Sequence, residues 1–179
     1  MDLIAGIKER RSIREFNNKD ISESTLREII DTARFYPSWK NTQTVRFIAV
    51  KSNLKALIAE NAVMGFEKNK ININGCNTLM VIATINGRSG YERDGNPTTS
   101  KGSHFQSFDA GLATEALVLS AYEKGVGSVI LGIYDESKIK EILNIGDDMS
   151  ISCIVAMGYY DNNPQAPKRK EIDEILKIV

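Results

Sequence analysis

The chain has 179 residues, enough to bury a sizeable core, and 42% of them are hydrophobic. Its 23 basic and 23 acidic residues cancel, which argues against a general binder of nucleic acid or of acidic membranes. Two cysteines and one histidine are too few for a disulfide framework or a zinc site. Because no apolar run reaches membrane-spanning length and no secretion signal opens the chain, we expect one reduced, cytoplasmic domain over residues 1–179.

The N-terminal third of the chain indicates two helices, a strand and a third helix. Residues 2–11 place apolar side chains at helical spacing behind an aspartate that can cap the helix. A stronger helix follows Ser22, which can cap it, and ends before Pro37, because the residue preceding a proline avoids the helical region. Residues 45–52 predict a strand, and residues 53–66 predict a helix of modest strength.

The rest of the chain adds three strands and two helices around one long loop. Residues 78–86 are apolar and β-branched without interruption, which suits a strand buried on both faces. Residues 87–104 are rich in Gly, Ser, Thr and charge, and loops of this length are usually functional or mobile. We then expect a long helix rich in small residues over 107–125, a strand over 127–133 and an amphipathic helix over 135–145. A buried strand over 150–160 and a tail over 161–179 that closes with a short helix complete the chain. Without strict βαβ regularity, this order predicts an α+β fold with a central, mainly antiparallel or mixed sheet.

Two basic clusters lie near opposite ends of the chain. They consist of Arg10, Arg11 and Arg14, which surround Ser12, and of Lys168, Arg169 and Lys170. Arginine forks match phosphate oxygens bidentately, and a serine hydroxyl or a backbone N–H completes such a site. Either cluster alone is more simply a solvated, charged surface. If the two clusters converge, they form a pocket for a phosphate dianion.

Two further stretches suit a flat ligand. In "YPSWKNTQTVRF", the amides of Asn41 and Gln43 can donate and accept together at the edge of a heterocycle, and Trp39 supplies a flat surface. In "GVGSVILGIYD", glycines around Leu131 let backbone groups approach closely. The plain alternatives are a polar loop and a tightly packed strand. The sequence holds no dinucleotide fingerprint, phosphate-binding loop, catalytic serine motif or carboxylate cluster, so we nominate no metal site.

Taken in order, these stretches resemble the nitroreductase family of FMN-dependent oxidoreductases. The family's opening pattern R-R-S-x-R is matched at residues 10–14, and its second pattern P-S-x-x-N-x-Q at residues 37–43. Its D-x-G motif is matched at residues 109–111, and the glycine-flanked strand that follows it at residues 125–132. The last element, a proline loop with an R-K pair, is matched at residues 164–175. Thr44 and Val45 depart from the family's Pro-Trp, and Glu115 stands where many members have glutamine. Residues 62–75 and 87–104 do not follow the family pattern, and such regions shape the substrate channel in the family.

The resemblance implies a three-layer fold and an obligate homodimer with two FMN sites between the subunits, the helix of residues 109–124 contributing to the interface. The residues that it places on or beside the FMN phosphate are Arg10, Ser12 and Arg169, with Arg11 and Lys168 as neighbours. It places Arg14 at the pyrimidine edge of the ring, where positive charge stabilises the reduced cofactor. The residues implied for the ribityl chain or the ring are Ser38, Asn41 and Gln43 through their side chains, and Ile130, Leu131 and Gly132 through their backbone.

The implied activity is a ping-pong transfer of a hydride from NADH or NADPH to FMN, and then to an electrophilic acceptor such as a nitroaromatic or a quinone. The resemblance nominates no catalytic side chain, because the cofactor performs the chemistry. Two alternatives stay open. The first is a flavin or azo reductase on the same fold, and the second is a flavin-binding sensor or carrier without turnover.

Overall fold

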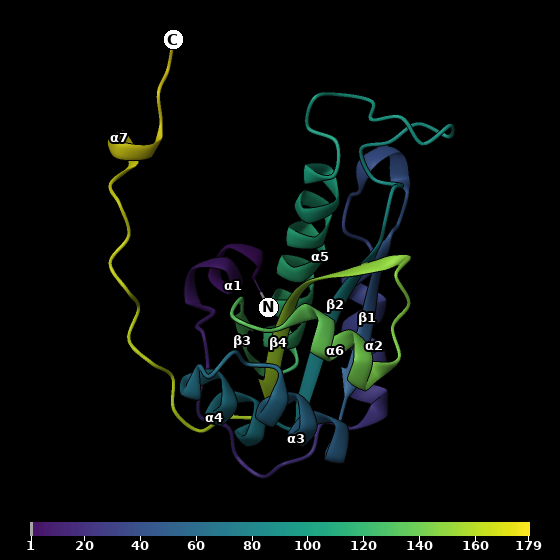
Figure 1. Cartoon of the computed structure of the whole chain (residues 1–179). Coiled ribbons are helices and arrows are strands. Elements are labelled where there is room, and N and C mark those ends of the chain that lie inside the picture. The colour runs from purple at the N-terminus through teal and green to yellow at the C-terminus, as the bar shows by residue number, and fades with distance from the viewer. Residues whose placement is uncertain (1) are drawn as a thin grey trace.

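The computed structural model describes residues 2–179, and its centre is a four-stranded antiparallel sheet (Figure 1). The strands are β1 (Val45–Val50), β2 (Thr78–Ile85), β3 (Gly127–Leu131) and β4 (Met149–Gly158). They lie in the order β1-β2-β4-β3, and all three neighbouring pairs are antiparallel. The predicted α+β class is therefore confirmed, and of the two predicted sheet types the antiparallel one forms.

Helices cover both faces of this sheet, which makes the three layers that the resemblance implied. The helices are α1 (Leu3–Glu9), α2 (Glu23–Ala33), α3 (Ser52–Asn61), α4 (Glu67–Gly75), α5 (His104–Glu123), α6 (Glu136–Leu143) and α7 (Ile172–Ile175). A single 3₁₀ turn spans Trp39–Asn41. Among residues 2–179, no helix is long and apolar enough to cross a lipid bilayer.

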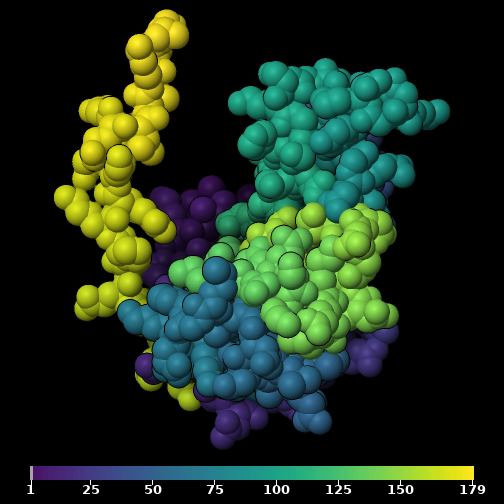
Figure 2. Space-filling model, in the orientation of Figure 1, coloured from purple at the N-terminus to yellow at the C-terminus, as the bar shows by residue number. Residues whose placement is uncertain are grey.

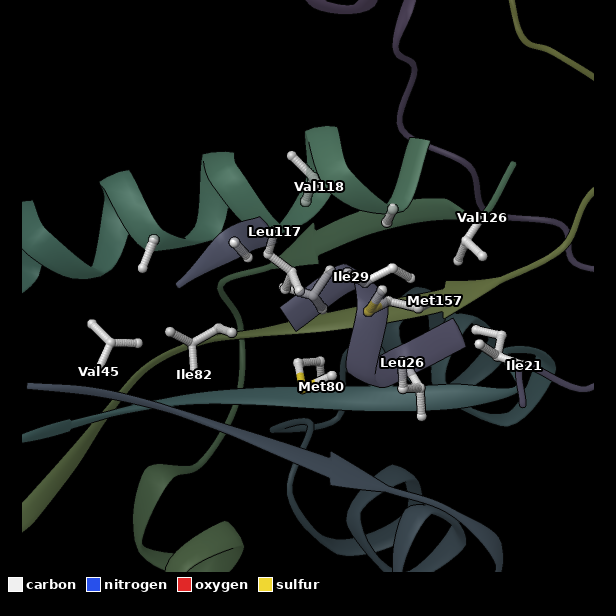
Figure 3. Close-up of a cluster of buried hydrophobic side chains, with 14 of the residues drawn as sticks. Ile21, Leu26, Ile29, Val45, Met80, Ile82, Leu117, Val118, Val126 and Met157 are labelled. Atoms are coloured by element: carbon white, nitrogen blue, oxygen red, sulfur yellow. The ribbon is translucent and has the colours of Figure 1, made fainter. Parts of the chain in front are cut away.

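The core consists of two apolar clusters, one on each face of the sheet. Met80 and Ile82 of β2 pack with α2 and α5 in the cluster of Figure 3. Leu79 and Val81 point to the other face, where they pack with side chains of α3, α4 and α6. Because successive side chains of a strand alternate between faces, β2 has to be apolar throughout, as its sequence predicts. Helix α5 turns its small residues inward to this core and ends at Gly125, whose φ is +69°.

One helix was missed by the sequence prediction, and two predicted boundaries were wrong. The helix predicted over residues 53–66 ends at Asn61, and a separate helix, α4, follows it. Helix α4 buries Asn69 and Asn72 as well as Ile73, so its sequence has almost no amphipathic pattern. Helix α5 begins at His104, three residues earlier than predicted, which shortens the preceding loop.

The C-terminal residues 161–179 form an arm that leaves the body and stays separate from it over most of its length (Figures 1 and 2). Every residue of the arm is exposed, including the apolar side chains Ile172, Ile175, Leu176 and Ile178. The predicted short helix forms as α7, whose first turn is closed by reciprocal bonds between Glu171 and Glu174. The arm therefore contributes several apolar side chains to the surface and none to the core.

Candidate functional site

The largest pocket beside a predicted site residue lies at the β3 edge of the sheet and has a volume of about 640 Å³. Its walls come from the segment that follows α1, from α4 and from the end of β3. The residues that line it include Arg14, Phe66, Asn69, Asn72, Ile130, Leu131 and Gly132. The structure thus brings one arginine of the first motif together with all three predicted residues of the strand motif.

The arginine segment is held in place by backbone bonds to the sheet. The N–H of Ile13 donates to the carbonyl of Ser128 at 2.9 Å, and Ser12 pairs with Ser128 in a parallel bridge. Farther along, the N–H of Asn17 donates to the carbonyl of Tyr159 at 2.8 Å. Ile13 is buried, whereas Arg14 is exposed, because neighbouring side chains of an extended segment point in opposite directions. The segment therefore presents its charge outward along β3.

The three arginines of this segment do different things. The guanidinium of Arg11 donates to the carbonyls of Lys8 and Arg10 at 2.8 and 2.9 Å, and thereby caps the C-terminal end of α1. Arg14 makes a long bond to the carbonyl of Ser12 at 3.3 Å and borders the pocket. The Arg10 side chain makes no hydrogen bond or ion pair within residues 2–179, so its guanidinium is free to bind an anion.

The end of β3 separates two pockets. The side chain of Ile130 is 48% exposed and borders both the 640 Å³ pocket and a second pocket of about 260 Å³. Glu115, Thr114 and Cys153 line the second pocket, on the side of α5. A flat ligand that lies against Ile130 can therefore extend into the 640 Å³ pocket, into the 260 Å³ pocket, or into both.

Two asparagines of α4 belong to the pocket, although the sequence analysis assigned them no role. Asn69 and Asn72 are both buried, and the amide of Asn69 donates to the carbonyl of Ile133 at 2.8 Å. Residues three apart share one face of a helix, so both amides face β3. The spacing of these asparagines was visible in the sequence, but the helix that makes it meaningful was not predicted.

The loop that carries Ser38, Asn41 and Gln43 is tightly built but lies elsewhere. The hydroxyl of Ser38 accepts from the N–H of Gln43 at 3.0 Å. Lys40, Asn41 and Gln43 have φ values of 44°, 55° and 49°, a backbone conformation that residues other than glycine rarely adopt. None of Ser38, Asn41 and Gln43 lines either pocket beside Ile130.

Asp109 of the D-x-G motif anchors this loop. Its carboxylate oxygens accept from the N–H of Trp39 at 3.1 and 3.0 Å, and one of them also accepts from the hydroxyl of Ser89 at 2.6 Å. Asp109 and Ser89 are buried. The sequence analysis used Asp109 only as a motif position and missed this contact, which joins residues 70 apart in the chain.

The basic residues of the tail are not joined to the first cluster in this chain. Lys168, Arg169 and Lys170 are exposed on the arm and make no hydrogen bond or ion pair with any of residues 2–179. The root of the arm does lie beside the arginine segment, because residues 162–164 and Ser12 line one pocket of about 240 Å³. The two clusters thus share a neighbourhood without meeting.

The remaining reactive groups do not form a catalytic centre of their own. Burial raises the pKa of the thiols of Cys76 and Cys153, which makes them poor nucleophiles at neutral pH, as the sequence predicted. Burial also raises the pKa of Tyr134 to about 12. Residues 2–179 contain no group of three or more His, Cys, Asp or Glu side chains that could hold a metal ion.

Known proteins resemble this chain over nearly its whole length. The sequence profile described as "Nitroreductase family" matches residues 7–71 and 67–159. A protein of Streptococcus pyogenes, provisionally named an NAD(P)H nitroreductase, is 24% identical over 95% of this chain and 96% of its own. YfhC of Bacillus subtilis has the same provisional name and is 26% identical over 93% and 88% of the two chains.

Solved structures share the fold. The nitroreductase family protein from Clostridium novyi NT is 30% identical, covers 89% of this chain and 86% of its own, and has a TM-score of 0.76. A protein of Exiguobacterium sibiricum, crystallised with FMN and provisionally described as a nitroreductase, is 21% identical and has a TM-score of 0.86 over 99% and 97% of the two chains.

Proposed function

Since this chain belongs to the nitroreductase family, we propose that it is an FMN-dependent oxidoreductase which takes a hydride from NADH or NADPH and reduces an electrophilic acceptor such as a nitroaromatic or a quinone. The observation that supports this most directly is the pocket at the β3 edge. It joins the first arginine motif to the backbone of Ile130, Leu131 and Gly132, two stretches more than a hundred residues apart in the sequence.

The residues around this pocket fit FMN. Ligand pockets measure about 300–1,000 Å³, a range that includes the 640 Å³ found here. The amides of Asn69 and Asn72 and the guanidinium of Arg14 supply donors and acceptors for the edge of a heterocyclic ring. The free guanidinium of Arg10 and the hydroxyl of Ser12 would hold the phosphate.

When bound, FMN supplies the electron-transfer chemistry by accepting a hydride and passing the electrons on. The residues of this chain would bind the FMN, orient its ring and polarise it. Arg14 places a fixed positive charge at the pocket, which stabilises negative charge that develops on a reduced ring. The exposed Ile130 offers an apolar contact. Among the described residues 2–179, only Glu15 brings a carboxyl group to the pocket lining.

We propose that the site is completed in a homodimer, with the loop of Ser38, Asn41 and Gln43 reaching the flavin of the partner. In support, that loop lies away from the pocket within its own chain, and apolar side chains of α1, of α5 and of the arm are exposed, namely Leu3, Ile4, Ile7, Phe108, Ile172 and Ile175. Covering a surface of this extent is typical of obligate dimers, which bury more than about 2,000 Å².

Lys168 and Arg169 would reach the phosphate by a change in the path of the arm. Arg169 lies five positions after Pro164, which lies beside Ser12. An extended chain covers about 3.5 Å per residue, so Arg169 is never more than about 17 Å from that point. Such a change would break no bond of these basic side chains, because they have no partner within residues 2–179.

The whole chain would then act as one nitroreductase-like domain in the cytoplasm. The two cysteines are free, and burial raises the pKa of both thiols. Free thiols persist in a reducing compartment, which supports this location.

Steady-state kinetics with a panel of acceptors test the activity. With NADH varied at several fixed concentrations of a quinone or a nitroaromatic, a ping-pong enzyme gives parallel double-reciprocal lines. Preference for free flavins or azo compounds would instead favour the flavin or azo reductase alternative. Flavin binding without turnover of any acceptor would contradict the proposal and favour a sensor or carrier.

A further inference from the structure

Two loops that are far apart in the sequence are tied together at two points. The first loop spans residues 38–43, and the second lies between β2 and α5, over residues 86–103. At the inner point, the carboxylate of Asp109 accepts both from the N–H of Trp39 and from the hydroxyl of Ser89. At the outer point, the ammonium of Lys40 lies 2.8 Å from the carboxylate of Glu92.

From these ties we propose that Asp109 is a positioning residue which couples the two loops, so that the segment of residues 86–103 controls flavin retention. The flavin part of this inference rests on the proposed function. Neither Asp109, Ser89 nor Glu92 borders the pocket beside Ile130, so each acts on the flavin only through the loop of residues 38–43.

This loop needs an external support because its backbone is strained. Lys40, Asn41 and Gln43 all have positive φ values, and non-glycine residues keep such conformations only when their surroundings hold them. Within the loop, support comes from the bond between the Gln43 N–H and the Ser38 hydroxyl and from two backbone bonds, Asn41 N–H to Ser38 C=O and Thr42 N–H to Trp39 C=O. The bonds that tie the loop to the segment between β2 and α5 come from Asp109 and from Glu92, both of which lie outside the loop.

The bifurcated bond from the Trp39 N–H to both oxygens of Asp109 requires a carboxylate. Both carboxylate oxygens lie within 3.1 Å of the same N–H, so each is positioned as an acceptor. In the variant Asp109→Asn, one of these oxygens becomes an NH₂ group, which meets the Trp39 N–H as a second donor or forces the side chain to turn. The shape is kept, but the bifurcated bond is lost.

The outer tie is specific to one of two similar carboxylates. Glu92 accepts from Lys40 and from the hydroxyl of Thr98, and these two donors lower the pKa of its carboxyl group. Asp94, two residues later, accepts only from the backbone and side chain of Asn96. Asp94→Asn is therefore a matched control for Glu92→Gln, because it removes a carboxylate from the same loop without touching residues 38–43.

Trp39 is the only tryptophan of the chain, which makes its fluorescence a reporter of this one loop. Its ring lies 4.2 Å from the ring of Phe105, measured between centroids. Release of the loop exposes the indole to water, shifts its emission to longer wavelength and increases quenching by acrylamide. This measurement needs no flavin and no activity.

The experiment compares FMN affinity and Trp39 emission in the full-length wild type and in Asp109→Asn, Ser89→Ala, Glu92→Gln and Asp94→Asn. We expect FMN to bind about tenfold more weakly to Asp109→Asn, since a buried acceptor is lost. Glu92→Gln should weaken binding by about two- to threefold, because an exposed ion pair is weak. The emission shifts should rank in the same order, and Asp94→Asn should match the wild type in both measurements.

Each result decides a different point. If the wild type binds FMN but Asp109→Asn, Ser89→Ala and Glu92→Gln bind it equally well, the coupling is refuted and the proposed function stands. The same holds if Asp94→Asn weakens binding as much as Glu92→Gln. If the wild type binds no FMN, the proposed function fails with the flavin part of the inference, while Trp39 emission still shows whether the loops are tied. If Asp109→Asn does not fold, Ser89→Ala and Glu92→Gln, each compared with Asp94→Asn, still test the coupling.

Discussion

The side chain of Ile13 occupies the space beside Gly127 where any other residue would carry its β-carbon. A β-carbon added to Gly127 would lie 2.7 Å from Cγ1 of Ile13 and 2.6 Å from Cδ1 of Tyr160. Ile13 sits between Ser12 and Arg14, so its depth fixes how closely the arginine segment approaches β3. The glycine at the start of β3 is thus a packing requirement of the candidate site.

Gly127→Ala is expected to lower the free energy of unfolding by about 1–3 kcal/mol, because the added methyl group overpacks this contact. It should also weaken FMN binding, since Ile13 and the neighbouring Arg14 are pushed away from β3. Thermal unfolding and a flavin titration measure the two effects. Gly75→Ala is the control: a β-carbon there meets no atom within 4 Å, so neither quantity should fall. Equal behaviour of the two variants would show that the Ile13 contact does not hold the site.

Arg10→Ala should weaken FMN binding about ten- to hundredfold, because a charge-assisted hydrogen bond contributes about 1.5–3 kcal/mol. Its neighbour provides the comparison. The guanidinium of Arg11 is engaged with carbonyls of Lys8 and Arg10, so Arg11→Ala should affect the stability of α1 more than FMN affinity. Isothermal titration of the apoproteins with FMN measures both. A larger loss of affinity in Arg11→Ala than in Arg10→Ala would reverse the assignment of the phosphate site.

Arg169→Ala should likewise release FMN more readily, whereas Lys170→Ala should have a smaller effect. Both residues are exposed on the arm, so neither substitution disturbs the core. The rate of flavin loss on dilution, followed by the rise of flavin fluorescence, separates the two variants. If neither variant loses FMN faster than the wild type, the tail has no part in the phosphate site.

The arm should hold the dimer together through its apolar side chains. Leu176 is 57% exposed in the single chain, so Leu176→Asp has no contact to lose within it. We expect this substitution to shift sedimentation from a dimer toward a monomer, because a charge would enter a desolvated interface. Lys177→Asp tests whether added negative charge alone has this effect. A wild type that sediments as a monomer would contradict the proposed dimer.

Stability should decline at alkaline pH, and Tyr134 should account for part of the decline. Burial raises the pKa of Tyr134 from 10.0 to about 12 in the folded chain, while its hydroxyl donates to the carbonyl of Ile151 at 2.7 Å. The unfolded chain therefore releases this proton first, so the stabilisation is complete below pH 10 and is lost as the pH rises toward 12.

Thermal unfolding across this pH range checks the sign. Tyr134→Phe should be less stable at neutral pH by about 1 kcal/mol, since the carbonyl of Ile151 loses its donor, and should lose less stability than the wild type on the way to high pH. Burial raises the pKa of Tyr36 as well, so some alkaline loss should persist in the variant. Equal slopes for wild type and variant would show that Tyr134 does not contribute.

Local signals in the sequence predicted most of the fold. Asp2, Ser22 and Asp135 cap their helices with the side-chain bonds expected of such residues, because a cap depends on neighbours only a few positions away. The uninterrupted apolar run of β2 identified a strand that packs on both faces. Helix α4 escaped prediction because its burial depends on asparagines that bond to another element, as Asn69 does to Ile133, and no local pattern encodes that contact.

The candidate site was predictable only in part, for the same reason. Family likeness assigned Arg14 and the backbone of Ile130, Leu131 and Gly132 to the same flavin ring, and one pocket joins these residues. The anchoring role of Asp109 was not foreseen, because an aspartate at 1% exposure is exceptional and its partners come from two distant loops. The path of the tail was not predictable either, because all of residues 161–179 are exposed and no packing against the body fixes it.

The most direct test of the central claim is an absorption spectrum of the purified protein, recorded before and after addition of NADH or NADPH without oxygen. The account predicts flavin bands, present on purification or after incubation with FMN, that bleach when the nicotinamide is added. Flavin bands that persist would contradict hydride transfer from NAD(P)H and favour a sensor or carrier. A protein that stays colourless after incubation with FMN would contradict the flavin site itself, and the arginines around Ser12 would then bind another anion.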